Sequence, residues 1–212
     1  MQPYADCDRP AADIVLDVEG IAGYFTALGL STAAGLNAYI PILSVGVLSR
    51  WTDLIDLPAP WDALGDPVVL GIVGVVGVAD FIGDKVPIVD HVLHVIGLGV
   101  APIAGGLLAL ASASAFDLDP GLAAGIGVIA ALATQAGRTA ARPLSTATTG
   151  GGANPAVSLA EDGVSGVLSM TAVFWPAITA VLAVIVLVAV FLLWRKWRQL
   201  RARFRRRDVP AI

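Results

Sequence analysis

Mostly apolar residues form five long stretches along the chain, and charged residues gather between them. The stretches cover residues 20–49, 67–83, 86–112, 120–137 and 155–194. A helix needs roughly 17–25 apolar residues to cross the hydrocarbon core of a bilayer, and each stretch reaches or exceeds that length. The pattern therefore predicts an all-α protein, a polytopic transmembrane helical bundle.

The first and last stretches are too long for one straight span, with about 30 and 40 residues. Gly35, Asn37 and Pro41 interrupt the first stretch, and Trp175-Pro176 interrupts the last. We therefore expect about six hydrophobic helices, with broken or re-entrant first and last elements.

Basic residues distinguish two layouts of the last stretch. As a single pass, it would place Lys85, Arg138 and Arg142 on the outer side of the membrane. As a hairpin of two helices, about 155–174 and 176–194, it places all three on the inner side together with the basic C-terminal tail. Because positive charge favours the cytoplasmic side, the hairpin is preferred.

Composition agrees with a membrane protein and excludes a soluble domain. Mean hydropathy is +0.80, with 57% hydrophobic and 14% charged residues, against about 25% charged residues in soluble domains. The single cysteine, Cys7, excludes an internal disulfide. We expect an N-terminal acidic segment (1–19), a transmembrane helical domain (20–194) and a basic cytoplasmic tail (195–212), in the inner membrane of a bacterium. The tail would contact anionic lipid headgroups.

The first candidate site lies where two predicted spans meet. Asp80 and Asp84 are four residues apart, as are Asp90 and His94, and His91 lies between the last two. Residues four apart share a helix face, and ionisable groups within spans usually meet a partner or a hydrated cavity. We expect a proton or cation site, with a divalent metal left open. The alternative is that these aspartates only cap helix ends.

The second candidate site is a polar stripe in the last stretch. Ser158, Asp162, Ser165 and Ser169 follow helical spacing along one face, and Glu161 lies beside it. Such a stripe is expected to face protein or water and not lipid. The alternative is that the serine hydroxyls bond carbonyls of their own helix.

Two further groups extend the second site. Arg138 and Arg142 could face an anion or the carboxylates Glu161 and Asp162, and a plain ion pair is the alternative. We expect the Thr- and Gly-rich segment before Asn154 to be a flexible loop that suits anions.

Asn37 is a third feature, in the middle of the first stretch. An amide at that depth must bond something. Two interpretations remain open: it holds an unwound helix break open for a ligand, or it ties two helices together.

Three motifs resemble a family of small bacterial membrane proteins catalogued as domain of unknown function 4126. They are GLNAYIP at 35–41, DKVPIVD at 84–90, and GANP at 152–155 followed by Ser158, Glu161 and Asp162. The resemblance covers roughly residues 20–193 and implies no activity.

We expect a membrane transporter or lipid-translocating protein with a buried polar pocket and no cofactor. The alternative is a non-catalytic subunit or assembly factor of a larger membrane complex, with a protein partner or homo-oligomerisation. No catalytic motif indicates an enzyme, and nothing indicates nucleic-acid binding. The predicted pathway residues are Asn37, Asp80, Asp84, Lys85, Asp90, His91, His94, Arg138, Arg142, Asn154, Ser158, Glu161 and Asp162.

Overall fold

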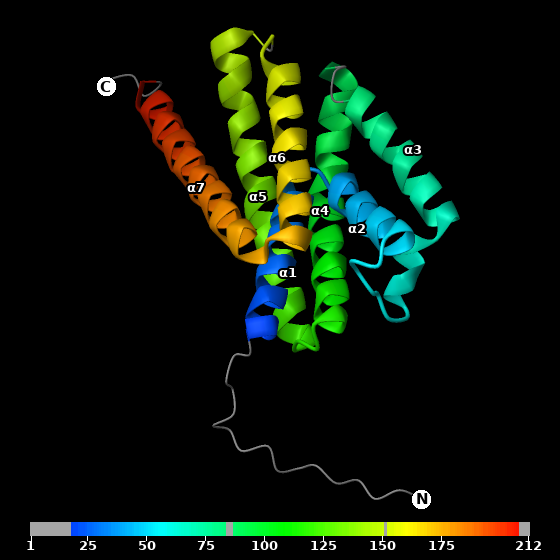
Figure 1. The fold of residues 1–212 in the computed structure, drawn as a ribbon. Helices are drawn as coiled ribbons and strands as arrows, with labels where there is room; N and C mark the ends of the chain where they lie inside the picture. Colours follow the sequence, from blue (N-terminus) through cyan, green and yellow to red (C-terminus); the bar gives the residue numbers. More distant parts are fainter. Residues whose placement is uncertain (1–17, 84–86, 151, 208–212) are drawn as a thin grey trace, which may run out of the picture.

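The structure, a computed structural model, describes residues 18–83, 87–150 and 152–207, and for 18–19, 87–95, 140–149, 154, 197 and 200–207 it describes the backbone only. In these ranges the fold consists of seven α-helices and one short 3-10 helix, without strands (Figure 1). The elements are α1 (Val18–Leu36), α2 (Tyr39–Trp51), η1 (Trp61–Gly65), α3 (Pro67–Gly83), α4 (Pro87–Ala115), α5 (Pro120–Thr149), α6 (Asn154–Phe174) and α7 (Pro176–Arg207).

The all-α prediction is confirmed, and several helix starts follow from local chemistry. The carboxylate of Asp119 accepts a hydrogen bond from the N–H of Leu122, and that of Asp66 accepts one from Val68. Each aspartate therefore caps a helix that opens with proline. Helices α4 to α7 each contain a segment long and apolar enough to cross a membrane, and α3, with 17 residues, lies at the lower limit.

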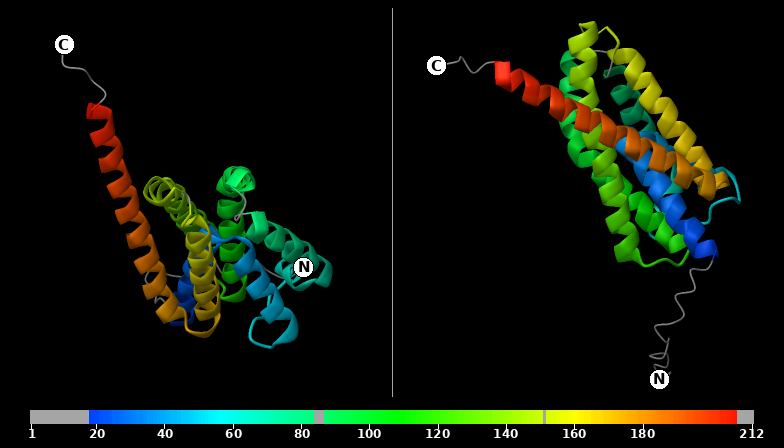
Figure 2. Two further views of the ribbon diagram at one scale, coloured as in Figure 1. Left: turned by 90° about the horizontal axis from the view of Figure 1, so that it is seen from above. Right: turned by 90° about the vertical axis from the view of Figure 1, so that its left-hand side faces the viewer.

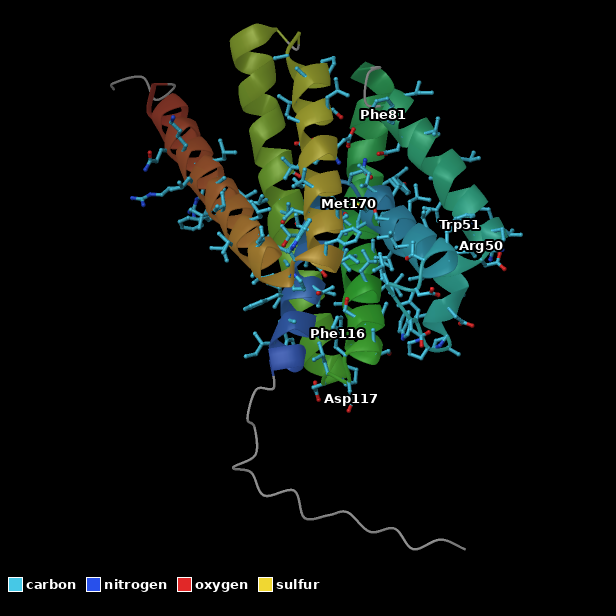
Figure 3. The ribbon with its side chains drawn as sticks, in the orientation of Figure 1. Arg50, Trp51, Phe81, Phe116, Asp117 and Met170 are labelled. Carbon is cyan, nitrogen blue, oxygen red and sulfur yellow. The ribbon has the colours of Figure 1, made fainter. Side chains whose placement is uncertain are left out.

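The bundle has two ends, and the basic segments gather at one of them. The end of α3, the start of α4, the α5–α6 connection and the C-terminal end of α7 lie at the same end of the bundle (Figure 1), although α7 diverges from the others there (Figure 2). The start of α1 and the α4–α5 turn lie at the opposite end, where Figure 3 labels Phe116 and Asp117. This arrangement agrees with the predicted hairpin layout of the last stretch.

Helices α1 and α2 form a re-entrant pair. A Cβ added to Gly23 near the start of α1 would lie 2.6 Å from Cβ of Phe116, at the end of α4. Residues 54–57, which follow α2, line a cavity that Phe116 also lines. Both ends of the pair therefore lie beside the C-terminal end of α4. The first stretch therefore turns back within the bundle, as the expected broken or re-entrant first element, and α3 to α7 run between the two ends.

The α6–α7 hairpin is confirmed, and the single-pass alternative is wrong. Trp175 leaves the helical region, with φ −144° and ψ 71°, and Pro176 opens α7. The chain reverses at this point (Figure 1), and α7 then crosses the other helices obliquely (Figure 2).

The prediction of a Thr- and Gly-rich loop before Asn154 is wrong. Helix α5 continues through this segment to Thr149, and only residues 150–153 connect it to α6. Gly150 ends α5 in the left-handed conformation, with φ 64°, where glycine has no Cβ penalty. Residues 143–149 include Pro143, Ser145 and three threonines, so intrinsic helix propensity does not explain this extension.

Small residues hold the core, which is centred on α1. Ala27, Ser31, Ala33 and Ala34 are fully or almost fully buried on this helix, which lies against α4, α5, α6 and α7. A Cβ added to Gly35 would lie 2.6 Å from the carbonyl oxygen of Ala131 on α5. Lipid chains are as apolar as leucine, so close backbone approach through small side chains replaces the hydrophobic effect as the source of helix association.

Candidate functional site

The break between α1 and α2 is occupied by the side chain of Asn37, which is 6% exposed. Its Nδ2 donates a hydrogen bond of 2.8 Å to Oδ1 of Asp162 on α6. Its Oδ1 accepts from the N–H groups of Tyr39 at 3.0 Å and Ile40 at 3.4 Å. The amide thus satisfies the start of α2 and ties it to α6, as the second interpretation expects, whereas a ligand at the break stays a prediction.

Ser165 of α6 satisfies the other side of the break. Its fully buried Oγ lies 3.0 Å from the carbonyl oxygen of Ala33 and 3.3 Å from that of Asn37. The carbonyl of Ala33 also accepts from the N–H of Asn37 at 2.9 Å, whereas the carbonyl of Asn37 follows the end of α1, where backbone acceptors lose their helical partners. In a membrane interior such groups need a protein partner, so α6 supplies the groups that permit the break.

The polar stripe of α6 faces protein, as its spacing predicts. Ser158 is 5% exposed, and Ser165 and Ser169 are fully buried. Ser169 donates to the carbonyl of Ser165 in its own helix, as the structural alternative expects. Ser165 instead reaches across to α1, so the stripe is an interhelical contact and not only a set of local hydrogen bonds.

Asp162 has one oxygen that is not engaged. Oδ1 accepts from Asn37, whereas the buried Oδ2 has no hydrogen-bond partner among the residues that the structure describes. The start of α2, with its positive dipole end, lies on the other side of the Asn37 amide. A carboxylate oxygen in this setting can accept a proton, a cation or a donor group of a substrate.

An ion pair lies next to this carboxylate. Nε of Arg138 on α5 is 2.7 Å from Oε2 of Glu161 on α6, and the two side chains are only 10% and 11% exposed. The predicted contact between Arg138 and the α6 carboxylates is therefore confirmed for Glu161.

Gln135 of α5 belongs to the same polar interior and was missed from the sequence. It is 2% exposed, and its Nε2 has no partner among the described residues. A Cβ added to Gly97 of α4 would lie 3.0 Å from this nitrogen. A usable signal existed, because Gln135 is an amide inside an apolar stretch, three residues before Arg138 and near it on the helix surface.

The first predicted cluster is only partly within the described residues. Asp80 lies in the last turn of α3, one turn after Gly77, where an added Cβ would lie 3.1 Å from Cβ of Tyr39 at the start of α2. Asp84 and Lys85 lie outside the described residues. Five other predicted residues have only their backbone described, within α4, α5 and α6: Asp90, His91, His94, Arg142 and Asn154. Their convergence stays a prediction.

The metal alternative is not decided by this part of the chain. Among residues with described side chains, no three His, Cys, Asp or Glu residues are grouped so that they could hold a metal ion. His91 and His94 lie outside that set.

Residues 24–196 match the family described as Domain of unknown function (DUF4126). The chain belongs to this family. The match covers the break at Asn37, the polar stripe and the Arg138–Glu161 pair, so the whole candidate site lies within the family's domain. No curated protein and no solved structure matches the chain significantly.

Proposed function

We propose that the protein is a membrane transporter or lipid-translocating protein whose path passes the Asn37–Asp162 hydrogen bond. The observation that carries the proposal is the unengaged Oδ2 of Asp162, buried beside a helix break. Ionisable groups inside membrane segments are costly and mark ion, proton or substrate paths. Broken helices that end within the bundle are a recurrent way to build such paths, since their free backbone groups contact the transported species.

In this proposal the polar residues divide the work. Asp80, Asp84, Asp90 and His94 carry a coupling ion or proton, and His can change its charge near neutral pH. The path is lined by Asn37, Asn154, Ser158, Glu161 and Asp162. Arg138 and Arg142 attract an anionic group. Because Arg138 is paired with Glu161, a bound anion would have to replace the Glu161 carboxylate as the partner of Arg138.

Orientation is part of the same proposal. Arg138 lies in the second half of α5, toward the bundle end where the basic tail leaves α7 (Figure 1). Because positive charge favours the cytoplasmic side of a membrane, this end would face the cytoplasm in a bacterial plasma membrane. The α4–α5 turn would then face outward.

The test is transport by the purified chain in proteoliposomes, with Asp162→Asn as the variant. One assay follows fluorescent phospholipids made accessible to dithionite, and the other follows proton entry with pyranine sealed inside. We expect the wild type to be active in at least one assay. We expect Asp162→Asn to lose at least about tenfold in that assay, the factor that corresponds to about 1.4 kcal/mol.

The matched control is Asp117→Asn. Asp117 is exposed at the α4–α5 turn with φ 52°, a conformation that asparagine also adopts, so this variant removes a carboxylate outside the bundle and should keep full activity. A wild type that is silent in both assays contradicts the proposal. So does an active Asp162→Asn variant. A silent wild type that co-purifies with a stoichiometric partner would favour the subunit alternative.

A further inference from the structure

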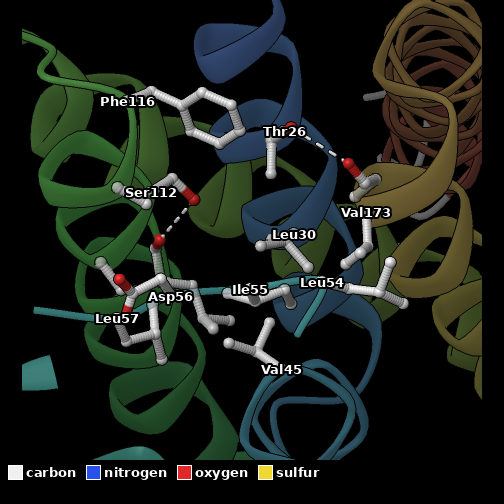
Figure 4. A pocket seen from close by; sticks show the side chains of 14 residues that line it. Thr26, Leu30, Val45, Leu54, Ile55, Asp56, Leu57, Ser112, Phe116 and Val173 are labelled. Carbon is white, nitrogen blue, oxygen red and sulfur yellow. Dashed lines mark hydrogen bonds between the residues drawn. The ribbon is translucent and has the colours of Figure 1, made fainter. Parts of the chain in front are cut away.

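An apolar cavity of about 230 Å³ lies between the re-entrant pair, α4 and α6 (Figure 4). Its walls include Leu30 of α1, Val45 of α2, Leu108 and Ala111 of α4, and Val173 of α6. Leu30 precedes Asn37 by about two helical turns. The cavity is therefore next to the proposed path, toward the bundle end that holds the start of α1.

Apart from the exposed carboxylate of Asp56, the polar side chains of the cavity wall are already engaged. Its two buried hydroxyl groups already donate to backbone carbonyls, Thr26 to Ala172 at 3.0 Å and Ser112 to Leu108 at 2.9 Å (Figure 4). Cavities with apolar walls stay dry and take up apolar molecules. The volume is below the 300–1,000 Å³ usual for a whole ligand, so the cavity suits one segment of a hydrocarbon chain.

The loop after α2 closes one side of the cavity with apolar side chains. Leu54, Ile55 and Leu57 all line it, although this loop lies in an acidic connection between helices. Asp56 lines it as well and is exposed. The loop therefore adds three apolar side chains and one exposed carboxylate to the same wall.

A polar depression of about 460 Å³ adjoins the cavity and shares Ile55, Asp56 and Leu57 with it. Arg50, Asp62 and Asp66 complete its charged lining, so carboxylates outnumber guanidinium groups there by three to one. Asp66 already accepts from the N–H of Val68, and Arg50 donates to the carbonyl of Gly65 at 3.2 Å. Asp56 and Asp62 remain the acceptors for a bound group.

We propose that these two adjoining spaces bind one ammonium-bearing phospholipid, with part of an acyl chain in the cavity and the headgroup in the depression. Asp56 would accept from the ammonium group, and Arg50 would face the phosphate. Binding of the acyl chain would be stabilised by packing contacts in the cavity. The hydrophobic effect contributes little, because the chain leaves hydrocarbon and not water. Such a lipid would be the substrate class of the proposed transporter, and this link to transport rests on the proposed function.

The test is lipid retention by the purified full-length chain, measured by native mass spectrometry with phosphatidylethanolamine and phosphatidylglycerol added in equal amounts. We expect the wild type to retain phosphatidylethanolamine preferentially. Ala111→Leu fills part of the cavity and should lower total retention roughly threefold to tenfold, through lost dispersion contacts. Ala133→Leu is the control, since Ala133 is exposed on α5 outside the cavity.

Asp56→Asn tests the headgroup separately and leaves the core intact. It should abolish the preference for phosphatidylethanolamine, whereas Asp53→Asn, in the same loop but outside both linings, should keep it. The proposal is overturned if the wild type binds both lipids equally. It is also overturned if Asp56→Asn behaves like Asp53→Asn, or if folded Ala111→Leu retains as much lipid as Ala133→Leu.

Binding and transport fail in different ways. A protein that retains phosphatidylethanolamine but is silent in both transport assays loses the proposed function and keeps this site. A protein that transports but shows no lipid preference loses this site and keeps the proposed function.

Discussion

Two long apolar stretches of this protein are each broken into two helices, and the two breaks differ in what fills them. At the first break, the amide of Asn37 contacts α6 and the start of α2, and the side chain is 6% exposed. At the second break, Trp175 is 59% exposed. One break is buried and polar, and the other lies at the surface and is apolar.

Backbone chemistry explains the difference. At Trp175 the lost helical hydrogen bonds are replaced locally, because its N–H donates to the carbonyl of Thr171 and its own carbonyl accepts from the N–H of Thr179. At Asn37 the N–H makes the same local bond, to the carbonyl of Ala33, but the carbonyl and the side-chain Nδ2 of Asn37 bond Ser165 and Asp162 of α6. A break satisfied only locally reverses the chain, whereas a break satisfied partly by a distant helix gathers polar groups in the interior. The second kind can become a site.

Asn37→Ala should produce the largest loss of stability. It removes the donor to Asp162 and the acceptor for the start of α2, while the carboxylate stays buried. We expect the free energy of unfolding to fall by about 3 kcal/mol, from a hydrogen bond to a charged group and a lost cap. This exceeds the roughly 0.6 kcal/mol typical of hydrogen bonds between membrane helices. Unfolding in mixed micelles measures it.

The double variant with Asp162→Asn provides the control for this coupling. If the two side chains act as a pair, the combined loss should be smaller than the sum of the single losses. Additive losses, or a loss below about 1 kcal/mol for Asn37→Ala, would show that the contact does not hold the first break together.

Gly35→Ala should have a smaller effect on the same break. Its added Cβ would lie 2.6 Å from both the carbonyl oxygen of Ala131 and Cβ of Thr134. Overpacking of this kind costs about 2 kcal/mol, visible as a lower unfolding midpoint. Gly163→Ala on α6 is the matched control, since nothing lies within 4 Å of its added Cβ. It should stabilise by up to about 1 kcal/mol through helix propensity. Equal signs for the two variants would contradict the close approach of α1 and α5.

Pro176→Ala should have the smallest effect. Proline at a helix start is favourable but not required, and the Trp175 break is satisfied by backbone groups of α6 and α7. We expect a loss below about 1 kcal/mol and unchanged transport in the proteoliposome assays. Loss of transport comparable to that of Asp162→Asn would mean that the second break also serves the path.

The sequence predicted the helices better than the contacts between them. The bounds of α3 agree with the expected 67–83, and both breaks fall at predicted interrupting residues. Arg138 was expected near Glu161 or Asp162, and it contacts Glu161. The pairing of Asn37 with Asp162, 125 positions apart, was not predicted, although both residues were candidates. Gln135 was not a candidate at all, because one uncharged amide disturbs an apolar pattern very little.

The sequence by itself determined that the chain is helical and apolar enough for a membrane, where its long helices are interrupted, and that one face of α6 is polar. These properties depend on composition and spacing, which are local. Only the tertiary structure decided that the first stretch turns back instead of crossing, and that Asn37 meets Asp162. The direction of a helix and the partners of its polar side chains depend on how the helices pack. Small residues allow several close packings, which an apolar sequence does not distinguish.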